Sequence, residues 1–214
     1  MVGAFLTFWR WLQLSKNKII AAICILFGVV MLAIPFFYHY KGTSETERLL
    51  EDFTESLEEE QDEETTGEKE EQTTISEADA SLFVEGDVIA ILEIEELGIK
   101  YPVVEGATSS NLNIAVGHLT ETAGIGESGN CVIAGHNGSR YGEYFTHLNK
   151  VSVGSEVTLL DREGITYTYE VAENFVTNPY DNSIKVQGEE TELTLFTCAN
   201  KGTMRFVVKC VLRE

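Results

Sequence analysis

The sequence predicts a mainly β domain, a compact barrel or sandwich with short helices, that is preceded by one transmembrane helix. Residues 19–38 form an apolar run without a charge, and residues 43–79 are strongly acidic. From about residue 80 the pattern changes to short β-prone runs separated by glycine, asparagine and aspartate. A chain of 214 residues has room for one domain of ordinary size besides the two N-terminal parts.

The apolar run has the length of a membrane span, because a helix rises about 1.5 Å per residue and the hydrocarbon core is about 30 Å thick. A cleaved signal peptide usually has an apolar region of only about 7–15 residues and a small-residue cleavage site, whereas this run ends in Pro-Phe-Phe-Tyr at 35–38. We therefore favour an uncleaved anchor. Arg10, Lys16 and Lys18 precede it, so the positive-inside rule predicts a single-pass protein of the cell membrane with a cytoplasmic N-terminus and an extracellular C-terminal domain.

The acidic stretch contains sixteen carboxylates and only two basic residues, Arg48 and Lys69. Its first half has apolar residues at the spacing of one helical face, which predicts an amphipathic helix: Leu49, Leu50, Phe53 and Leu57. Residues 58–71 have too little apolar content to be buried and are expected to be extended and solvated. We interpret the stretch as a charged extracellular spacer, with a docking or regulatory role as the alternative.

Composition argues against several kinds of partner. The formal net charge is −20, whereas binding to nucleic acid would need a basic face. The four cysteines, at 24, 131, 198 and 210, form no CxxC pair and no Cys/His cluster. Because no dense acidic loop indicates calcium either, we expect no metal, no cofactor and no disulfide framework.

Short β-prone runs fill the remainder of the chain, and they predict strands at 88–94, 99–104, 130–134, 156–160, 166–171, 192–197 and 205–211. Gly98, Gly154 and Gly164 have the positions of turn residues, and short helical turns are expected at 111–114 and 144–148. So many short strands indicate one barrel or sandwich. The expected division of the chain is 1–18 (cytoplasmic), 19–40 (anchor), 41–79 (linker) and 80–214 (catalytic domain).

A cysteine and an arginine are predicted to face each other near the C-terminus. The apolar run 194–197 ends in Cys198, residues 199–202 form a turn, and Arg205 begins the next run. Antiparallel pairing across this turn places Arg205 opposite Cys198. A nearby cation favours the thiolate, which is the nucleophilic form. A cysteine in an apolar strand is more often a small buried hydrophobe, and Cys131 and Cys210 fit that interpretation.

A histidine could supply the acid and base for such a thiol. His136 follows an apolar strand that ends in glycine, and strand ends can present a side chain to a substrate. His118 has a similar setting, so spacing alone leaves both histidines open, whereas His147 is interpreted as structural. A distant Cys–His pair is compatible with nucleophilic acyl transfer, in which an arginine stabilises the developing oxyanion.

Two motifs resemble those of one enzyme family. Thr-Leu-Phe-Thr-Cys at 194–198 resembles the Thr-Leu-x-Thr-Cys signature of the sortases, which are membrane-anchored cysteine transpeptidases. Gly-Asn-Cys-Val-Ile-Ala-Gly-His at 129–136 resembles their histidine strand. The resemblance implies the eight-stranded sortase barrel and makes His118 a loop residue. It implies catalytic roles for His136, Cys198 and Arg205 and substrate contacts for Ala134 and Thr197.

The resemblance also implies a reaction. Sortases cleave a C-terminal sorting motif of the Leu-Pro-x-Thr-Gly kind in surface proteins, hold it as a thioacyl enzyme and transfer it to an amine, usually on a peptidoglycan precursor. Residues 174–190 resemble the loop that selects the substrate. A thiol hydrolase that passes the intermediate to water, or an inert anchored β-domain that binds surface proteins, would be the alternatives.

Other features concern the subclass. Only six residues separate Cys198 from Arg205, no Asp-Pro-aromatic lid precedes the barrel and no second apolar span follows it. The last two features argue against a pilin-polymerising, class C enzyme. Gly-His-Asn at 135–137 resembles class B, whereas Ala-Gly-His at 134–136 resembles classes A, D and E, so the subclass stays open.

Overall fold

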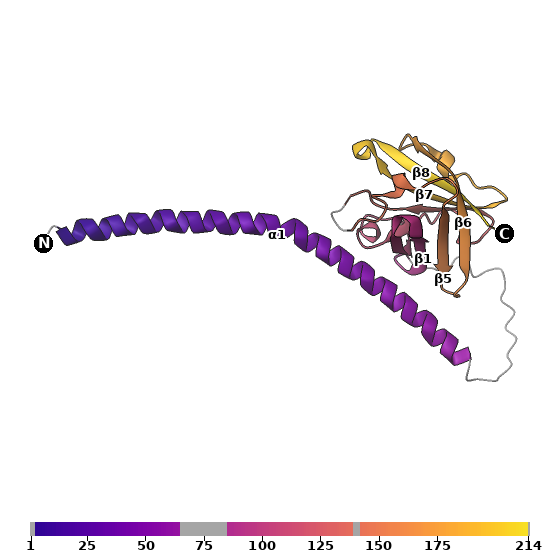
Figure 1. Cartoon of the computed structure of the whole chain (residues 1–214), viewed down its shortest axis with the longest axis horizontal. Coiled ribbons are helices and arrows are strands. Elements are labelled where there is room, and N and C mark those ends of the chain that lie inside the picture. The colour runs from indigo at the N-terminus through magenta and orange to yellow at the C-terminus, as the bar shows by residue number, and fades with distance from the viewer. Residues whose placement is uncertain (1–2, 65–84, 139–141, 214) are drawn as a thin grey trace. The chain divides into compact units, whose positions relative to one another are not determined.

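The computed structural model describes residues 3–64, 85–138 and 142–213. Its contacts divide the chain into two compact units, Met1–Tyr40 and Lys41–Glu214. Helix α1, Gly3–Glu64, begins in the first unit and ends in the second. Figure 1 shows this helix and the β-barrel of the second unit.

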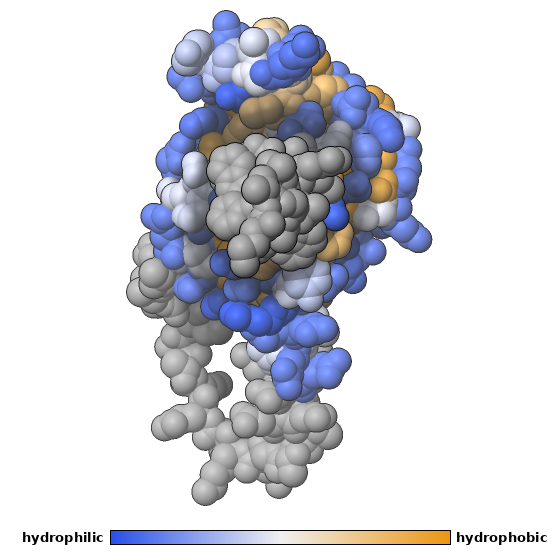
Figure 2. All heavy atoms as spheres, turned by 90° about the vertical axis from the view of Figure 1, so that its left-hand side faces the viewer, coloured by the Kyte–Doolittle hydropathy of each residue, from blue (hydrophilic) through white to orange (hydrophobic). Residues whose placement is uncertain are grey.

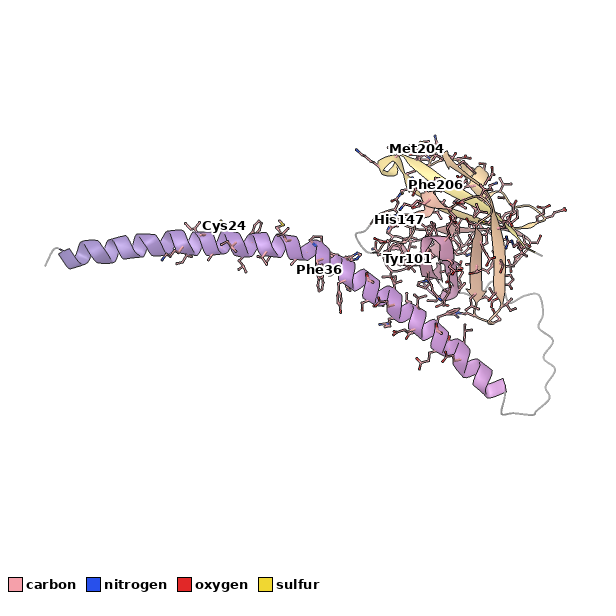
Figure 3. All side chains as sticks on the ribbon, in the orientation of Figure 1. Cys24, Phe36, Tyr101, His147, Met204 and Phe206 are labelled. Atoms are coloured by element: carbon pink, nitrogen blue, oxygen red, sulfur yellow. The ribbon has the colours of Figure 1, made fainter. Side chains whose placement is uncertain are left out.

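The first unit is the apolar part of α1. Its large apolar side chains are exposed around the helix; for example, Leu32 is 77% and Phe36 is 73% exposed. Figure 3 marks Cys24 and Phe36 on this part of the helix. The helix is long and apolar enough to cross a membrane, and a helix that is apolar on all sides needs lipid or protein around it.

The second unit begins with the acidic part of α1, which carries the apolar stripe expected from the sequence. Phe53 is only 4% exposed, and the three leucines of the stripe are half-buried. The Thr46 hydroxyl donates a hydrogen bond to the carbonyl oxygen of Ile114 at 2.6 Å. The helix continues to Glu64, so the expected extended chain is wrong for 58–64; glutamate is a strong helix former. Residues 65–71 lie outside the described residues.

Eight strands close into a barrel in the order β1-β2-β3-β4-β7-β8-β6-β5, which confirms the expected fold (Figure 1). They are β1 Val88–Ile94, β2 Ile99–Glu105, β3 Val116–His118, β4 Gly129–Ala134, β5 Glu156–Asp161, β6 Thr166–Thr177, β7 Thr191–Ala199 and β8 Met204–Leu212. The pairs β2–β3 and β4–β7 are parallel, and the other pairs are antiparallel. Short 3-10 turns connect them: η2 Glu95–Leu97, η3 Asn111–Asn113, η4 Leu148–Lys150, η5 Asn182–Lys185 and η6 Asn200–Gly202.

Seven of these strands lie where the sequence predicts them, and β3 is the exception. It is only three residues long and ends in His118, so the expectation that His118 is a loop residue is wrong. The strand is held by long-range pairing with β2 and β4, which a local pattern does not reveal. Strand β6 is also longer than expected, because it runs on to Thr177.

Strand β4 is buried on both faces. One face packs into the barrel core, and the other packs against a second apolar cluster. Cys131 and Ile133 point into the main core, with large side chains such as Phe145 and Tyr169. On the opposite face, Val132 and Ala134 pack with a smaller cluster: Ala107, Leu112, Leu119 and Phe196. Blue, hydrophilic residues cover most of the coloured surface visible in Figure 2, with smaller orange areas.

Candidate functional site

Strand order and register bring the three predicted catalytic residues to one place. Strands β4, β7 and β8 are neighbours in the barrel. In the parallel pair β4–β7, Ala134 lies opposite Phe196. His136 comes two residues after Ala134 and Cys198 two residues after Phe196, so both lie at the same edge of the barrel. In the antiparallel pair β7–β8, Cys198 lies directly opposite Arg205, which confirms the register predicted from the turn.

A groove of about 520 Å³ lies over this edge. All five residues singled out from the sequence line it: Ala134, His136, Thr197, Cys198 and Arg205. Its floor includes residues of the second apolar cluster, among them Leu112, Leu119 and Phe196. An extended peptide with an apolar side chain would therefore find both an apolar floor and a thiol in one groove.

The hairpin that carries Cys198 and Arg205 is short and tightly turned. Asn200 and Lys201 have positive φ angles of 48° and 58°, which lets six residues reverse the chain. Arg205 is half-buried, and its Nη1 donates to the carbonyl oxygens of Gly202 at 3.1 Å and Met204 at 2.9 Å. In Figure 3, Met204 and Phe206 mark the part of β8 that contains Arg205. These bonds hold the guanidinium against the backbone of the turn, and Arg205 and the half-buried Cys198 line the same groove.

Hydrogen bonds to the backbone of Gly135 and His136 position the histidine. The amide of Gly135 donates to the carbonyl of Phe196 at 3.1 Å, and the Thr197 hydroxyl donates to the carbonyl of Gly135 at 2.7 Å. The amide of Phe145 donates to the carbonyl of His136 at 3.0 Å. Among the described residues, no group hydrogen-bonds the imidazole ring. Partial burial lowers the pKa of His136 below its ordinary value of 6.5.

The glycine before the histidine is required by packing. A Cβ atom at Gly135 would lie 2.5 Å from Cδ2 of Phe145, whose side chain is fully buried. Contacts this short force a shift of the neighbour or of the strand end. The Ala-Gly-His sequence thus lets β4 end closely against Phe145 and aim His136 into the groove.

The segment between β6 and β7 forms one wall of the groove, with Pro179, Asp181 and Lys185 among the residues that line it. Asp181 caps η5 by accepting from the amide of Ser183 at 2.9 Å, and this bond together with one from Thr177 lowers the pKa of Asp181. Residues 174–177 of the expected substrate-selecting segment 174–190 belong to β6, and residues 178–190 connect β6 to β7.

Sequence reasoning missed the opposite wall, which includes Leu119, Thr120 and Glu121. Glu121 forms an ion pair with Lys185 across the groove, with 2.7 Å between Oε1 and Nζ. Residues 119–121 follow β3, which was not predicted. The sequence feature that could have indicated this wall is Glu121, a charged residue three positions after His118.

The other histidines do not line this groove. His118 is buried, with Nδ1 at 2.9 Å from Oε2 of Glu105 and Nε2 at 3.0 Å from the carbonyl oxygen of Ala123. His147 is partly exposed and lies 3.8 Å from Glu143. The geometry thus favours His136 over His118 as the partner of the thiol.

Two further cysteines are core residues, as expected. Cys131 and Cys210 are each 1% exposed. Burial raises the pKa of both thiols, that of Cys210 to about 12, so neither forms a thiolate readily. Within residues 3–64, 85–138 and 142–213, no group of three or more His, Cys, Asp and Glu residues is placed to hold a metal ion.

Comparison with known proteins gives consistent results. The family model for the sortase domain matches residues 92–213. Sortase D of Bacillus subtilis is 32% identical over 114 residues, which are 53% of this chain and 55% of that protein. The chain thus spans little more than half the length of the curated relatives it matches.

Solved structures agree with this match. A Clostridium perfringens Sortase D5 transpeptidase superposes with a TM-score of 0.64 at 32% identity, over 80% of this chain and all of that chain. Clostridium perfringens sortase C, solved with the C-terminal cell wall sorting motif, has a TM-score of 0.59 at 25% identity, over 78% of this chain and 90% of that chain.

Proposed function

The chain belongs to the sortase family, and from this premise we propose that it is a membrane-anchored cysteine transpeptidase that attaches surface proteins to an amine of the cell wall. The observation that carries the proposal is the convergence of His136, Cys198 and Arg205, from or beside three neighbouring strands, on one groove. A thiol, a proton carrier and a fork of hydrogen-bond donors are what acyl transfer needs.

In the first half-reaction Sγ of Cys198, as thiolate, attacks the carbonyl carbon of the threonine in the sorting motif. The new carbon–sulfur bond forms as the Thr–Gly peptide bond breaks, and His136 gives a proton to the leaving amine. Arg205 donates hydrogen bonds to the carbonyl oxygen, whose negative charge grows in the transition state. The product is a thioacyl enzyme.

In the second half-reaction an amine of a peptidoglycan precursor attacks the thioester. The amine's proton passes to His136, the new amide bond forms, and Cys198 leaves as thiolate. Each proton given in the first step is thus recovered in the second, so the cycle needs no cofactor.

The substrate is a peptide of the Leu-Pro-x-Thr-Gly kind. This proposal is supported by the apolar floor of the groove and by the similarity to Clostridium perfringens sortase C, whose structure includes a sorting motif. Ala134 and Thr197 line the groove next to the catalytic residues, where they would contact the peptide. The Thr197 hydroxyl already donates its proton to the carbonyl of Gly135, so toward a peptide it could act only as an acceptor.

The location follows from the sequence around the apolar helix. Arg10, Lys16 and Lys18 precede the span and an acidic stretch follows it, so we place residues 1–18 in the cytoplasm and the barrel outside the cell. Residues 19–40 serve as the anchor, 41–79 as the linker and 80–214 as the catalytic domain. The sorting peptide and the amine would both be met at the outer surface of the membrane.

Incubation of the full chain with a quenched Leu-Pro-x-Thr-Gly peptide, with and without an amine acceptor, tests the proposal. An amine-dependent product supports transfer. Cleavage to the free acid alone indicates a thiol hydrolase, and binding without a thioacyl adduct indicates an inert domain. Mass spectrometry of the trapped adduct should locate it on Cys198.

Two substitutions test the assigned roles. Cys198→Ala should abolish turnover, and full turnover in this variant would overturn the assignment. Arg205→Lys should lose most activity, because a point charge does not reproduce a planar fork of donors. Full activity of Arg205→Lys would remove the arginine from the oxyanion role.

A further inference from the structure

The wall of the groove between β6 and β7 has little core of its own. Within residues 178–190 it contains only the short turn η5, and Ile184 is the one residue of this segment that is buried. An irregular segment of this kind loses conformational entropy when it is ordered, and hydrogen bonds to a rigid element can compensate for that loss. Here the rigid element is the start of β4.

Asn130 on β4 supplies the first set of bonds. Its side chain is almost fully buried, with the residue 1% exposed. Nδ2 donates to the carbonyl oxygen of Ile184 at 2.9 Å and to that of Val186 at 3.4 Å. Oδ1 accepts from the Thr194 hydroxyl at 2.8 Å. The amide therefore links β4, β7 and the groove wall, and no part of it is left unsatisfied.

Gln187 supplies the second set from the other side. Its Oε1 accepts from the amide of Asn130 at 2.9 Å, and its Nε2 donates to the carbonyl oxygen of Asn130 at 3.1 Å. The Gln187 side chain thus pairs with the Asn130 backbone as a neighbouring strand would. The same Nε2 donates to the carbonyl of Lys185 at 2.9 Å, which fixes the turn before it.

Gly129 makes this arrangement possible. Its φ angle is +122°, which an L side chain rarely adopts. A Cβ atom there would lie 2.7 Å from Oε1 of Gln187 and 2.8 Å from Cβ of Ala123. Only glycine lets the glutamine side chain reach the start of β4.

We propose that Asn130 and Gln187 are positioning residues for peptide recognition, which hold residues 182–187 in the shape of the groove wall before the peptide arrives. The inference rests on the proposed function for its substrate. All of the side-chain bonds described above go to the wall, to β7 or to the start of β4, and none goes to His136, Cys198 or Arg205. A wall ordered in advance reduces the entropy lost on binding, so the pair acts on affinity and not on the chemical step.

The ion pair between Lys185 and Glu121 is a weaker link in the same wall. Its side chains are 35% and 58% exposed, so solvent and salt screen their attraction. It joins the wall to Glu121, whereas the Asn130–Gln187 pair joins the wall to β4 and, through Oε1 of Gln187, to the amide of Ala123 at 3.3 Å. The amide pair is therefore the one that should hold the wall at high salt.

Three variants of the full chain in detergent distinguish a role in positioning the groove wall from an effect on the stability of the whole fold. Asn130→Asp keeps the shape but replaces the Nδ2 donor with an oxygen that faces two carbonyls. Gln187→Ala removes the second set of bonds from an exposed side chain. Thr194→Val is the matched control, because it removes the bond to Oδ1 of Asn130 and leaves both bonds to the wall.

Hydrogen–deuterium exchange measures how well the wall is ordered in the absence of substrate. Exchange of the amides in 182–187 should become at least about tenfold faster in Asn130→Asp and in Gln187→Ala, because each variant loses more than one hydrogen bond, and should stay at the wild-type rate in Thr194→Val. Unchanged exchange in both wall variants would overturn the proposal. Gln187→Ala decides the matter if Asn130→Asp does not fold.

Kinetics with the Leu-Pro-x-Thr-Gly peptide provide the second measurement. KM should rise about tenfold in both wall variants while kcat stays within about twofold, and Thr194→Val should keep the wild-type KM. A fall in kcat without a rise in KM would contradict a positioning role. If the wild-type chain cleaves no sorting peptide, the proposed function fails, whereas the exchange rates still decide whether the pair holds the wall.

Discussion

Asn137 donates a hydrogen bond from Nδ2 to the carbonyl oxygen of Cys198 over 2.6 Å, and it thereby links the residue after His136 to the cysteine itself. The bond joins the segment that follows β4 to the end of β7. Together with the bond from the Thr197 hydroxyl to Gly135, it braces the histidine and the thiol on both sides. Their relative position thus depends on two side chains that carry out no chemistry.

Asn137→Ala should lower kcat about tenfold and leave KM near the wild-type value, because the loss of one hydrogen bond loosens the thiol relative to the imidazole. Asn137→Asp should be slower still, since a carboxylate oxygen would face the Cys198 carbonyl. Thr146→Val is the control: it removes the neighbouring bond to the amide of Gly138 and leaves the bond to Cys198 intact. Equal kcat values for all three variants would contradict the bracing role.

The pKa of His136 should lie below 6.5 in the folded protein, because burial disfavours the charged ring. An NMR titration of the ring protons measures it, with the signal assigned by its absence in His136→Gln. A midpoint at or above 6.5 would show that burial is not the dominant influence on this ring.

The same shift makes stability depend on pH. The unfolded chain binds a proton at this histidine near pH 6.5, whereas the folded chain binds it only at lower pH. As the pH falls through 6.5 the unfolded state therefore gains protons first, and the free energy of unfolding decreases. His136→Gln should show a smaller decrease than the wild type between pH 7 and 5 in denaturant titrations.

The buried pair of Glu105 and His118 should matter for stability. Glu105→Ala leaves the buried His118 ring without its hydrogen-bond partner, which should destabilise the fold by about 1–3 kcal/mol. Glu105→Gln retains an acceptor for Nδ1 and should cost less, about 1 kcal/mol. Thermal unfolding of the two variants measures the difference. If Glu105→Ala were as stable as the wild type, the pair would have no structural role.

The hairpin at the thiol contains a residue in an unfavourable conformation. Lys201 has a φ angle of 58° without being glycine, so Lys201→Gly should stabilise the fold by about 0.5–1 kcal/mol. Thr203, with a φ of −79°, is the control, because glycine there adds backbone freedom and removes the hydroxyl bond to Asn200, so it should destabilise by at least a similar amount. A loss of stability in Lys201→Gly would show that the lysine side chain contributes more than the strain costs.

Local patterns predicted much of this molecule. Seven strands follow from alternating β-prone runs between turn residues, and the short turn at 199–202 sets Cys198 opposite Arg205 because so few residues leave little freedom of register. The turn positions of Gly98, Gly154 and Gly164 are confirmed by their positive φ angles. These features depend on neighbours in the chain, so a single sequence contains them.

Long-range contacts account for what was missed. Strand β3 exists through its pairing with β2 and β4, and the closed strand order depends on two parallel pairs that no turn specifies. The bonds between Asn130 and the groove wall join residues 54 to 57 positions apart. An asparagine inside an otherwise apolar strand was the signal for them, because a buried amide must find partners.

The hydrogen bond from Thr46 to Ile114 and the burial of Phe53 bear on how the protein can be produced in recombinant form. Truncation at residue 80, the boundary that the sequence suggests, would remove both side chains and leave the Ile114 carbonyl without this donor. The apolar site that Phe53 occupies would then face water and favour aggregation. A fragment that starts at Lys41 retains the docked helix and omits the apolar span, so it is the better choice for crystals and assays.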